Sequence, residues 1–521
     1  MKSLSACLLS ASAVLASLAG LVPACAERRE PPAPAVPAKP LSSYIIEAPA
    51  GVPRPPFEFS QADDQFLDDV QRGAFNYFWN AANPHSQMVP DRTSKHFLSM
   101  AGVGFQLASI CIGVERQWIS REQGEARALH ILRTLESRTD IRKAGLFYHF
   151  LEGDTAGQPG PDAKPPERLV STIDSALLFC GVLTASSYFG GEIASIGDRL
   201  VADANWAHFV LGTSPDTAEV HANSNGFISL GWKPADAADP TGKGALLPYA
   251  WIDCGDEHRL VTFLAVAAPK PEHRVPPETY YKLRRKIGSY GDTGPLAYFP
   301  WSGALFVSTF AHCFLDHSRL GPDDPAAFGV RNRPRVDWWE NARRTTRLHQ
   351  IKCAENPLKL PTLSAQAWGL TASDKENGYL VAGVFPDAIP VSGALPELDY
   401  PLFTPKDEWG DGTIAPYAAG CTVMFDPGPA VAAMRYYASL KREDGTPLVW
   451  RHPDNPGPAG YGFRDAFNLG TGWAGPDDLA IDQGPLIVSI ENARTGLIWK
   501  MFGKHPVVAR GLADLKLCPA K

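Results

Sequence analysis

Apolar residues recur along most of the chain at the three-to-four-residue spacing of amphipathic helices. Between residues 63 and 82, Phe66, Val70 and Ala74 fall on one stripe, aspartates occupy the first turn, and Asn-Pro follows the segment. The same reasoning predicts further helices at 104–113, 120–135, 172–188, 256–267, 336–353, 427–440 and 484–502. The pattern therefore predicts a chain built mainly of helices of modest length.

Long segments rich in Gly, Pro and Trp separate these helices, at 153–166, 232–251, 291–303, 354–417 and 450–478. Strand patterns are weak, and neither βαβ alternation nor a G-x-G-x-x-G motif is present to suggest a dinucleotide enzyme. No short internal repeat indicates a solenoid. Helices that alternate with long loops predict a toroid of helix pairs. Its loops would form a cleft at one end, where binding and catalytic residues collect.

The N-terminal region predicts export from the cytoplasm. In residues 1–26, Lys2 precedes an apolar stretch and small residues surround Cys25, which is the pattern of a signal peptide. Cleavage before Cys25 would leave a lipid-anchored protein and is slightly favoured over a soluble cut after Ala26. The proline-rich residues 27–56 predict a semi-rigid linker. We expect a catalytic domain at 57–510, a C-terminal tail at 511–521, and a periplasmic or outer-membrane-anchored location.

Composition narrows the range of functions. The net charge is −7, and no Lys/Arg run suits a phosphate backbone, which argues against a nucleic-acid partner. The 13 Trp offer flat faces that suit sugar rings, although any single Trp is more often a core residue. The cysteines are widely spaced without a C-x-x-C pair, and the histidines are scattered. We therefore expect no metal, no cofactor and a monomer with mostly buried free thiols.

Acidic residues beside Trp or Gly at helix starts are the strongest chemical signal. Glu257 and Asp174 lie at the starts of predicted helices, Asp482 lies just before one, and Asp411 lies in a W-G-D-G loop. Each alone also fits a helix cap or a turn. Together they suit cleavage of a glycosidic bond, which needs two carboxyl groups. No G-x-S-x-G motif suggests a serine nucleophile instead.

Several ordered segments resemble the glycoamylase-like domain family, across about residues 63–505. They are FLDDVQRGAFNYFWNAANP, MVPDRT, GFQLASICIGVERQWISREQ, GLFYHFL, VSTIDSALLFCGVL, AWGLTASD, DGTIAPYAAG, YGFRDAFN and IDQGPLIVSIENARTGLIWKMF. That family includes the bacterial endo-β-1,2-glucanases of glycoside hydrolase family 144, and a related domain occurs in cyclic β-1,2-glucan synthases. The resemblance implies an (α/α)6 barrel, inverting hydrolysis, and β-1,2-glucan or its oligosaccharides as substrate. Residues 308–312 and 365–367 depart from the family pattern.

The resemblance also suggests roles for individual residues. Glu257 matches the family's acidic position and would be the general acid. Asp174 leads as the general base, with Asp482 and Asp411 as alternatives. The candidate substrate-binding residues are Arg92, Trp251, Trp301, His312, Trp368, Trp409, Arg464, Trp473 and Gln483. Two readings stay open beside this one: an exo-acting hydrolase or transglycosylase of another glycan, and a non-catalytic glycan-binding lipoprotein.

Overall fold

The computed structural model describes residues 39–160, 168–221, 223–235, 242–392 and 406–519. The predicted signal peptide, Cys25 and the first part of the predicted linker lie outside the described residues. Within them, helices carry the core, and the strands are only two to four residues long. The prediction of a helix-rich fold is confirmed.

Four helices are buried on nearly every side. They are α3 (Met100–Glu115), α5 (Thr172–Phe189), α7 (Asp256–Ala267) and α12 (Ala480–Arg494). The sequences of α3 and α5 are apolar around almost the whole circumference, as expected for helices enclosed by others, whereas α7 and α12 also bury polar residues. α3 packs against both α12 and α5, and α5 packs in turn against α7. α5 is long and apolar enough to cross a membrane, but it lies mostly inside the molecule and is a core helix.

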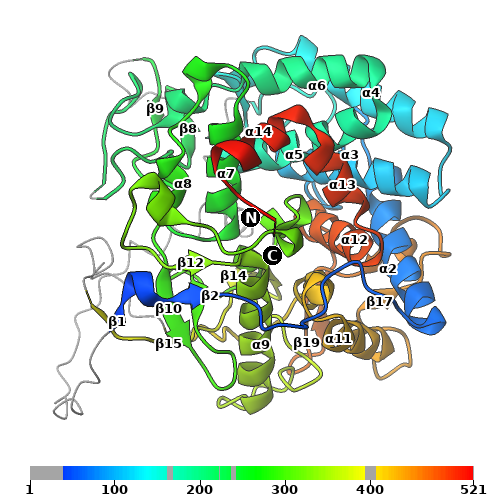
Figure 1. Ribbon diagram of the computed structural model, residues 1–521. Coiled ribbons are helices and arrows are strands. Elements are labelled where there is room, and N and C mark those ends of the chain that lie inside the picture. The colour runs from blue at the N-terminus through cyan, green and yellow to red at the C-terminus, as the bar shows by residue number, and fades with distance from the viewer. Residues whose placement is uncertain (1–38, 161–167, 222, 236–241, 393–405, 520–521) are drawn as a thin grey trace.

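A second layer of helices surrounds the buried ones (Figure 1). α2 packs against α12 and α3, α6 against α5, and α14 against α7, although α14 and α7 are far apart in sequence. Each outer helix turns an apolar stripe inward and polar residues outward. The outer helices are α2 (Gln61–Asn80), α4 (Arg121–Ser137), α6 (Gly191–Asp203), α11 (Pro427–Ser439), α13 (Leu497–Lys504) and α14 (Pro506–Asp514). The remaining α-helices are α8 (Glu278–Lys282), α9 (Trp338–Glu355) and α10 (Pro416–Cys421).

Glycines bring the backbones of α3 and α5 into direct contact. A Cβ atom on Gly104 would overlap the carbonyl group of Leu177, and one on Gly181 would overlap the carbonyl group of Gly104. Both glycines are helical, so close approach rather than backbone conformation requires them. This glycine contact sets the separation of the two central helices.

Short antiparallel strands fix where the buried helices begin. β3 (Leu98–Ser99) pairs with β6 (Phe150–Leu151) and leads directly into α3, while β7 (Val170–Ser171) leads directly into α5. β7 also begins a three-stranded sheet with β8 (Gly231–Lys233) and β9 (Ala245–Leu246). The other strands are β1 (Lys39–Pro40), β2 (Ile45–Ile46), β4 (Arg142–Lys143), β5 (Leu146–Phe147), β10 (Lys286–Ser289), β11 (Leu296–Tyr298), β12 (Arg335–Val336), β13 (Ala372–Lys375), β14 (Gly378–Val381), β15 (Asp387–Ala388), β16 (Val391–Ser392), β17 (Trp450–Arg451), β18 (Gly462–Phe463), β19 (Phe467–Asn468) and β20 (Trp473–Ala474).

Both ends of the described chain lie against the helices. Residues 39–56, expected to belong to a linker, form β2, which pairs in parallel with β12 and buries Ile46. Arg54 continues this attachment by pairing with Asp337 at 2.6 Å. At the other end, α14 and the buried Leu515 occupy part of the expected tail. These segments therefore belong to the folded domain.

Most predicted helices are present with shifted ends. The segment predicted at 484–502 is two helices, because Gly496 has a positive φ of 69° and separates α12 from α13. The helix predicted at 104–113 begins earlier, at Met100, after the N-cap Ser99. Six of the cysteines outside the signal are buried free thiols and Cys518 is exposed.

Candidate active site

A pocket opens where the N-terminal ends of α3, α5 and α12 come together. The space inside it that water-sized spheres can occupy is about 40 Å³, so the pocket is small. Helix N-terminal ends carry partial positive charge and stabilise carboxylates. The pocket is lined by Asp91, Arg92, Ser99, His149, Phe150, Asp174, Phe306, Phe310, Ala372, Tyr379, Tyr417, Leu479, Ile481 and Asp482.

Asp174 occupies the first turn of α5 and faces His149 across the pocket wall. Ser171 caps the helix, since its hydroxyl oxygen accepts a hydrogen bond from the Asp174 N–H at 3.2 Å. Nε2 of His149 lies 3.4 Å from Oδ1 of Asp174, and the imidazole ring stacks on Phe150. The other carboxylate oxygen, Oδ2, is buried without a hydrogen-bond partner among the described residues. This oxygen is available to accept a hydrogen bond from a water molecule or a sugar hydroxyl.

Glu257 lies in the first turn of α7, next to the start of α5. Burial raises its pKa well above the usual 4.5, and the negative charges of Asp174 and Asp256 add to that shift. The side chain is 6% exposed. Glu257 does not line the pocket itself, but its electrostatic partner Asp174 does. This environment favours the protonated carboxyl group, the form that a general acid needs.

Trp251 holds the starts of α5 and α7 together. Its indole N–H donates to Oγ1 of Thr172, the first residue of α5, at 2.7 Å. The edge of its ring packs on His258 in α7, with the ring centroids 4.8 Å apart. Trp251 is buried, so it braces the two helices. A sugar platform needs an exposed ring face, but the ring of Trp251 is buried.

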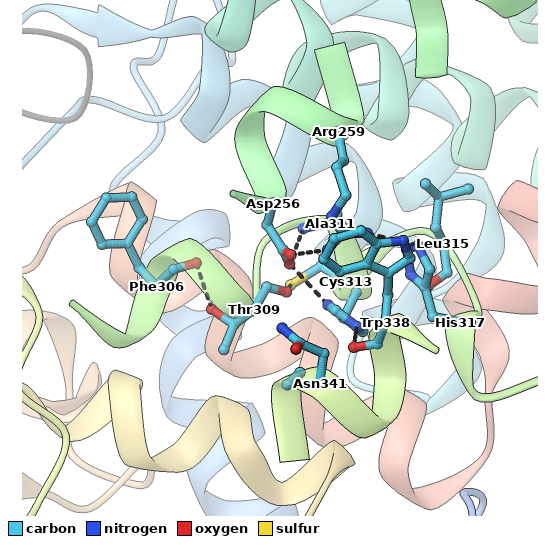
Figure 2. Close-up of polar contacts among 12 residues, drawn as sticks. Asp256, Arg259, Phe306, Thr309, Ala311, Cys313, Leu315, His317, Trp338 and Asn341 are labelled. Atoms are coloured by element: carbon cyan, nitrogen blue, oxygen red, sulfur yellow. Dashed lines mark hydrogen bonds and ion pairs between the residues drawn. The ribbon is translucent and has the colours of Figure 1, made fainter. Parts of the chain in front are cut away.

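Asp256, which precedes Glu257, is the centre of a buried polar network (Figure 2). Its carboxylate pairs with Arg259 one turn later and accepts a hydrogen bond from the Ala311 N–H at 2.9 Å. Burial opposes its ionisation, but Arg259 and His312 together lower the Asp256 pKa. An ionised Asp256 therefore anchors the first turn of α7 to the segment around Ala311. Because Glu257 is the next residue of α7, its backbone is held in place as well.

His312 belongs to this network and not to the pocket. Its Nδ1 lies 2.8 Å from Oδ2 of Asp256, and its Nε2 lies 3.1 Å from the Trp338 carbonyl oxygen. The side chain is 1% exposed. Both ring nitrogens are thus used inside the protein. The sequence suggested that His312 contacts the substrate, but the structure places it away from the pocket.

Asp482 brings a second group of carboxyl groups to the pocket. Burial raises its pKa well above the usual value, and the charge of Asp465, in the loop between β18 and β19, raises it further. The Asp374 backbone N–H donates to Oδ2 of Asp465 at 2.9 Å. Arg92 donates from Nη1 to Oδ2 of Asp374 at 2.8 Å. Burial and the charge of Asp465 raise the pKa of Asp374 to about 7.

Asp411 and all five predicted tryptophans lie away from the pocket lining. Asp411 accepts a hydrogen bond from the Thr413 N–H at 3.0 Å, which is the turn interaction that its sequence also allowed. Trp368 is only 1% exposed and is a core residue. Trp409 is also buried, whereas Trp473 in β20 is partly exposed.

Among the polar residues predicted to bind substrate, some line the pocket and others do not. Arg92 lines the pocket. Arg464 donates to the Gly475 carbonyl oxygen at 2.9 Å, and Trp301 contacts the buried Asp253. Gln483 follows Asp482 and donates from Nε2 to the Phe463 carbonyl oxygen at 2.8 Å, which leaves its buried Oε1 without a partner among the described residues.

Sequence reasoning missed three groups at this site: His149, Asp374 and Asp465. All three lie in segments that carry the family resemblance, GLFYHFL, AWGLTASD and YGFRDAFN. The signal of His149 and Asp465 was a polar residue enclosed by aromatic neighbours in a loop. Among the residues that the structure describes, no group of three or more His, Cys, Asp or Glu is arranged to hold a metal ion.

Comparisons with known proteins agree with this architecture. Residues 248–506 match the glycoamylase family, described as "Putative glucoamylase". A crystal structure with that description, from Bacteroides uniformis, is 28% identical, with a TM-score of 0.67, covering 88% of this chain and 98% of that one. The endo-β-1,2-glucanase from Chitinophaga pinensis, solved with sophorotriose and glucose, is 25% identical, with a TM-score of 0.66, covering 88% and 98%. The fold is therefore one shared with helical glucanases.

A curated relative extends the comparison. The exo-β-1,2-glucooligosaccharide sophorohydrolase (non-reducing end) of Parabacteroides distasonis is 27% identical over 488 residues, which cover 88% of this chain. The match covers 58% of that relative, so the chain spans less than two thirds of its length. Taken together, these matches show that the chain is similar to glycoamylase-like proteins along most of its length, with the family model itself matching just under half of it.

Proposed function

We propose that this protein hydrolyses glycosidic bonds in β-1,2-glucan or its oligosaccharides. The observation that carries the proposal is the set of three buried acids, Asp174, Glu257 and Asp482, at the starts of neighbouring helices. Two of them line one pocket and one is held in a setting that favours its protonated form. The β-1,2-glucan activities named for the Parabacteroides and Chitinophaga relatives support the choice of substrate.

The chemistry follows from the separate environments of these acids. Glu257 would donate its proton to the glycosidic oxygen as that oxygen leaves the anomeric carbon. A carboxylate on the other side of the pocket, Asp174 or Asp482, would take a proton from the attacking water. Addition of water from the opposite face inverts the anomeric configuration. Inverting pairs stand about 6.5–9.5 Å apart to admit this water.

The same proposal includes a closed (α/α)6 barrel. Its support is the succession of packed central helices, from α12 to α3, α5 and α7, with a second helical layer outside them. In such a barrel the starts of the central helices share one end. That arrangement would bring Asp174, Glu257 and Asp482 to a common cleft.

Exo action is the second candidate for the mode of attack. It is favoured by the name of the Parabacteroides relative, which releases sophorose from non-reducing ends, whereas the Chitinophaga relative is an endo-glucanase. Product size separates the two modes. Endo action shortens long chains early and gives mixed oligosaccharides, while exo action releases one small product from the start.

The deciding experiment is incubation with linear β-1,2-glucan, with β-1,3-glucan, β-1,4-glucan and starch as linkage controls. We expect reducing sugar from the β-1,2-glucan alone, and α-configured products in NMR spectra recorded early in the reaction. Glu257→Gln is the matched variant and should bind the glucan but release little product. Absence of hydrolysis together with glucan binding would favour the non-catalytic reading, and hydrolysis of another glycan would refute the linkage.

We also propose that the protein is exported and acts as a monomer in the periplasm or on the outer membrane. The support is the segment 1–26, with a lipid anchor on Cys25. Mass spectrometry of the N-terminus of the native protein tests this. Acylated Cys25 supports the anchor, an unmodified Glu27 removes only the lipid, and an intact Met1 refutes export.

A further inference from the structure

Asp465 and Asp482 approach each other in a way that two ionised carboxylates cannot. Their side chains lie within hydrogen-bonding contact. Oδ1 of Asp465 and Oδ2 of Asp482 are both buried, and neither has a hydrogen-bond donor among the described residues. A carboxylate oxygen can only accept a hydrogen bond. A hydrogen bond between the two side chains therefore requires one proton between them.

The groups around this pair are mostly acidic. Asp374 donates its backbone N–H to Asp465 at 2.9 Å, while its own carboxylate accepts from Arg92. The charge of Arg92 acts on Asp465 and Asp482, and the charge of Asp477 opposes it at Asp465. On the α10 side, the hydroxyl group of Tyr417 faces Asp482 but donates to the Ala372 carbonyl oxygen. Arg92 thus faces several carboxyl groups at once, and retention of a proton relieves the excess negative charge.

We propose that Asp465 and Asp482 share one proton and form the base side of the reaction, with Asp482 facing the pocket and Asp465 acting through it as a positioning residue. Asp482 lines the pocket and Asp465 does not. The inference rests on the proposed glucan hydrolysis and resolves the choice of base in favour of Asp482.

The proton transfer balances within the pair. The attacking water forms a bond to the anomeric carbon and gives one proton to the oxygen of Asp482 that faces the pocket. The shared proton moves from Asp482 to Asp465 in the same step. Asp482 remains neutral, and the negative charge of Asp465 is neutralised. The proton that Glu257 gives to the leaving oxygen completes the balance, and later exchange with solvent restores both groups.

Asp465→Asn tests the pair by kinetics. The amide can donate to Asp482, so Asp482 no longer needs the shared proton and ionises at lower pH. We expect kcat to fall by about one to two orders of magnitude, because a carboxylate of lower pKa is a weaker base. KM should change little, and the acid limb of the pH–rate profile should move to lower pH. Asp444→Asn is the matched control: it removes an exposed carboxylate that acts on neither member of the pair and should keep the parental kcat.

Infrared spectroscopy supplies a readout that does not depend on activity. Glu257→Gln combined with Asp374→Asn retains the pair but lacks the other carboxyl groups of the site whose pKa is raised, since the pKa of Asp374 is about 7. At neutral pH it should show the carbonyl stretch of a protonated carboxyl group, and adding Asp465→Asn should remove that band. If Asp465→Asn does not fold, Asp465→Glu replaces it in the kinetic test and should retain the parental acid limb.

The outcomes separate the two proposals. Absence of the carboxyl band in the Glu257→Gln, Asp374→Asn double variant overturns the shared proton. An Asp465→Asn enzyme with parental kcat and an unmoved acid limb overturns the role of Asp465. A band that disappears with Asp465→Asn in a protein that hydrolyses no glucan would retain the pair and reject the proposed function.

Discussion

Replacement of Glu257 by glutamine tests the mechanism most directly. Glutamine keeps the shape of the side chain but cannot donate the acidic proton. We expect turnover on β-1,2-glucan to fall by a factor of about 10²–10⁴, the usual contribution of general acid catalysis. Binding of the glucan should change little. Initial rates from reducing-sugar release and binding by calorimetry measure the two effects on the same preparation.

The structure also predicts how this variant changes stability with pH. Burial, then Asp174 and Asp256, raise the native pKa of Glu257 above its usual 4.5. Below that pH, both folded and unfolded parental protein hold the proton. As pH rises above it, the unfolded chain ionises first, so the parental protein loses about 1.4 kcal/mol of stability per pH unit until the native pKa is reached. Glutamine has no such loss. The variant should therefore become progressively more stable than the parent as pH rises.

Urea unfolding of both proteins at several pH values between 4 and 8 measures this difference. Glu125→Gln is the matched control, because Glu125 is an exposed glutamate of α4. It should alter neither turnover nor the pH dependence of stability. Parental turnover in Glu257→Gln, or a stability difference that stays constant with pH, would refute the argument for a buried, protonated general acid.

Three further predictions follow from other sites. Trp368→Ala should lower the free energy of unfolding by about 3–5 kcal/mol, since a fully buried Trp is removed, while KM for glucan in the folded fraction stays at the parental value; a raised KM with parental stability would make Trp368 a sugar platform instead. Asp411→Asn should leave kcat unchanged, because asparagine can still accept the hydrogen bond from Thr413, and a large loss of kcat would return Asp411 to the catalytic candidates. Dialysis against a chelator should leave activity unchanged, and activity restored by one particular divalent ion would reveal a metal site.

The helices were predictable because burial leaves a periodic trace in the sequence. α2 shows the one-sided stripe of an outer helix, and α5 shows the continuous apolar run of an enclosed one. The structure of the chain ends was harder to predict from the sequence. β2 was expected to be linker because prolines surround it, yet its neighbour β12, which satisfies its backbone, is almost 300 residues away.

The pocket was only partly predictable. Asp174, Asp482 and Arg92 line it, and their positions at helix starts and in a family-like segment were visible in the sequence. The tryptophans behave differently, because whether a ring faces solvent depends on helices that pack over it. Trp251 illustrates this: its loop position suggested a sugar contact, but Thr172 in α5 receives its N–H.

The proton-sharing pair was beyond reach for another reason. Asp465 and Asp482 are separated by a loop and two short strands, and each alone looks like an ordinary acid. They share a proton only because the fold places both near Asp374 and the guanidinium group of Arg92. No local sequence pattern predicts that contact.

The glycine contact between α3 and α5 has a consequence for how this protein can diversify. Because Gly104 and Gly181 leave no room for even a methyl group, substitutions there would force the central helices apart and widen the distance between Ser99 and Asp174. New specificities should therefore arise by changes in the loops around the pocket, while the glycine contact between α3 and α5 stays constant. Libraries aimed at altered chain-length preference are best confined to the rim.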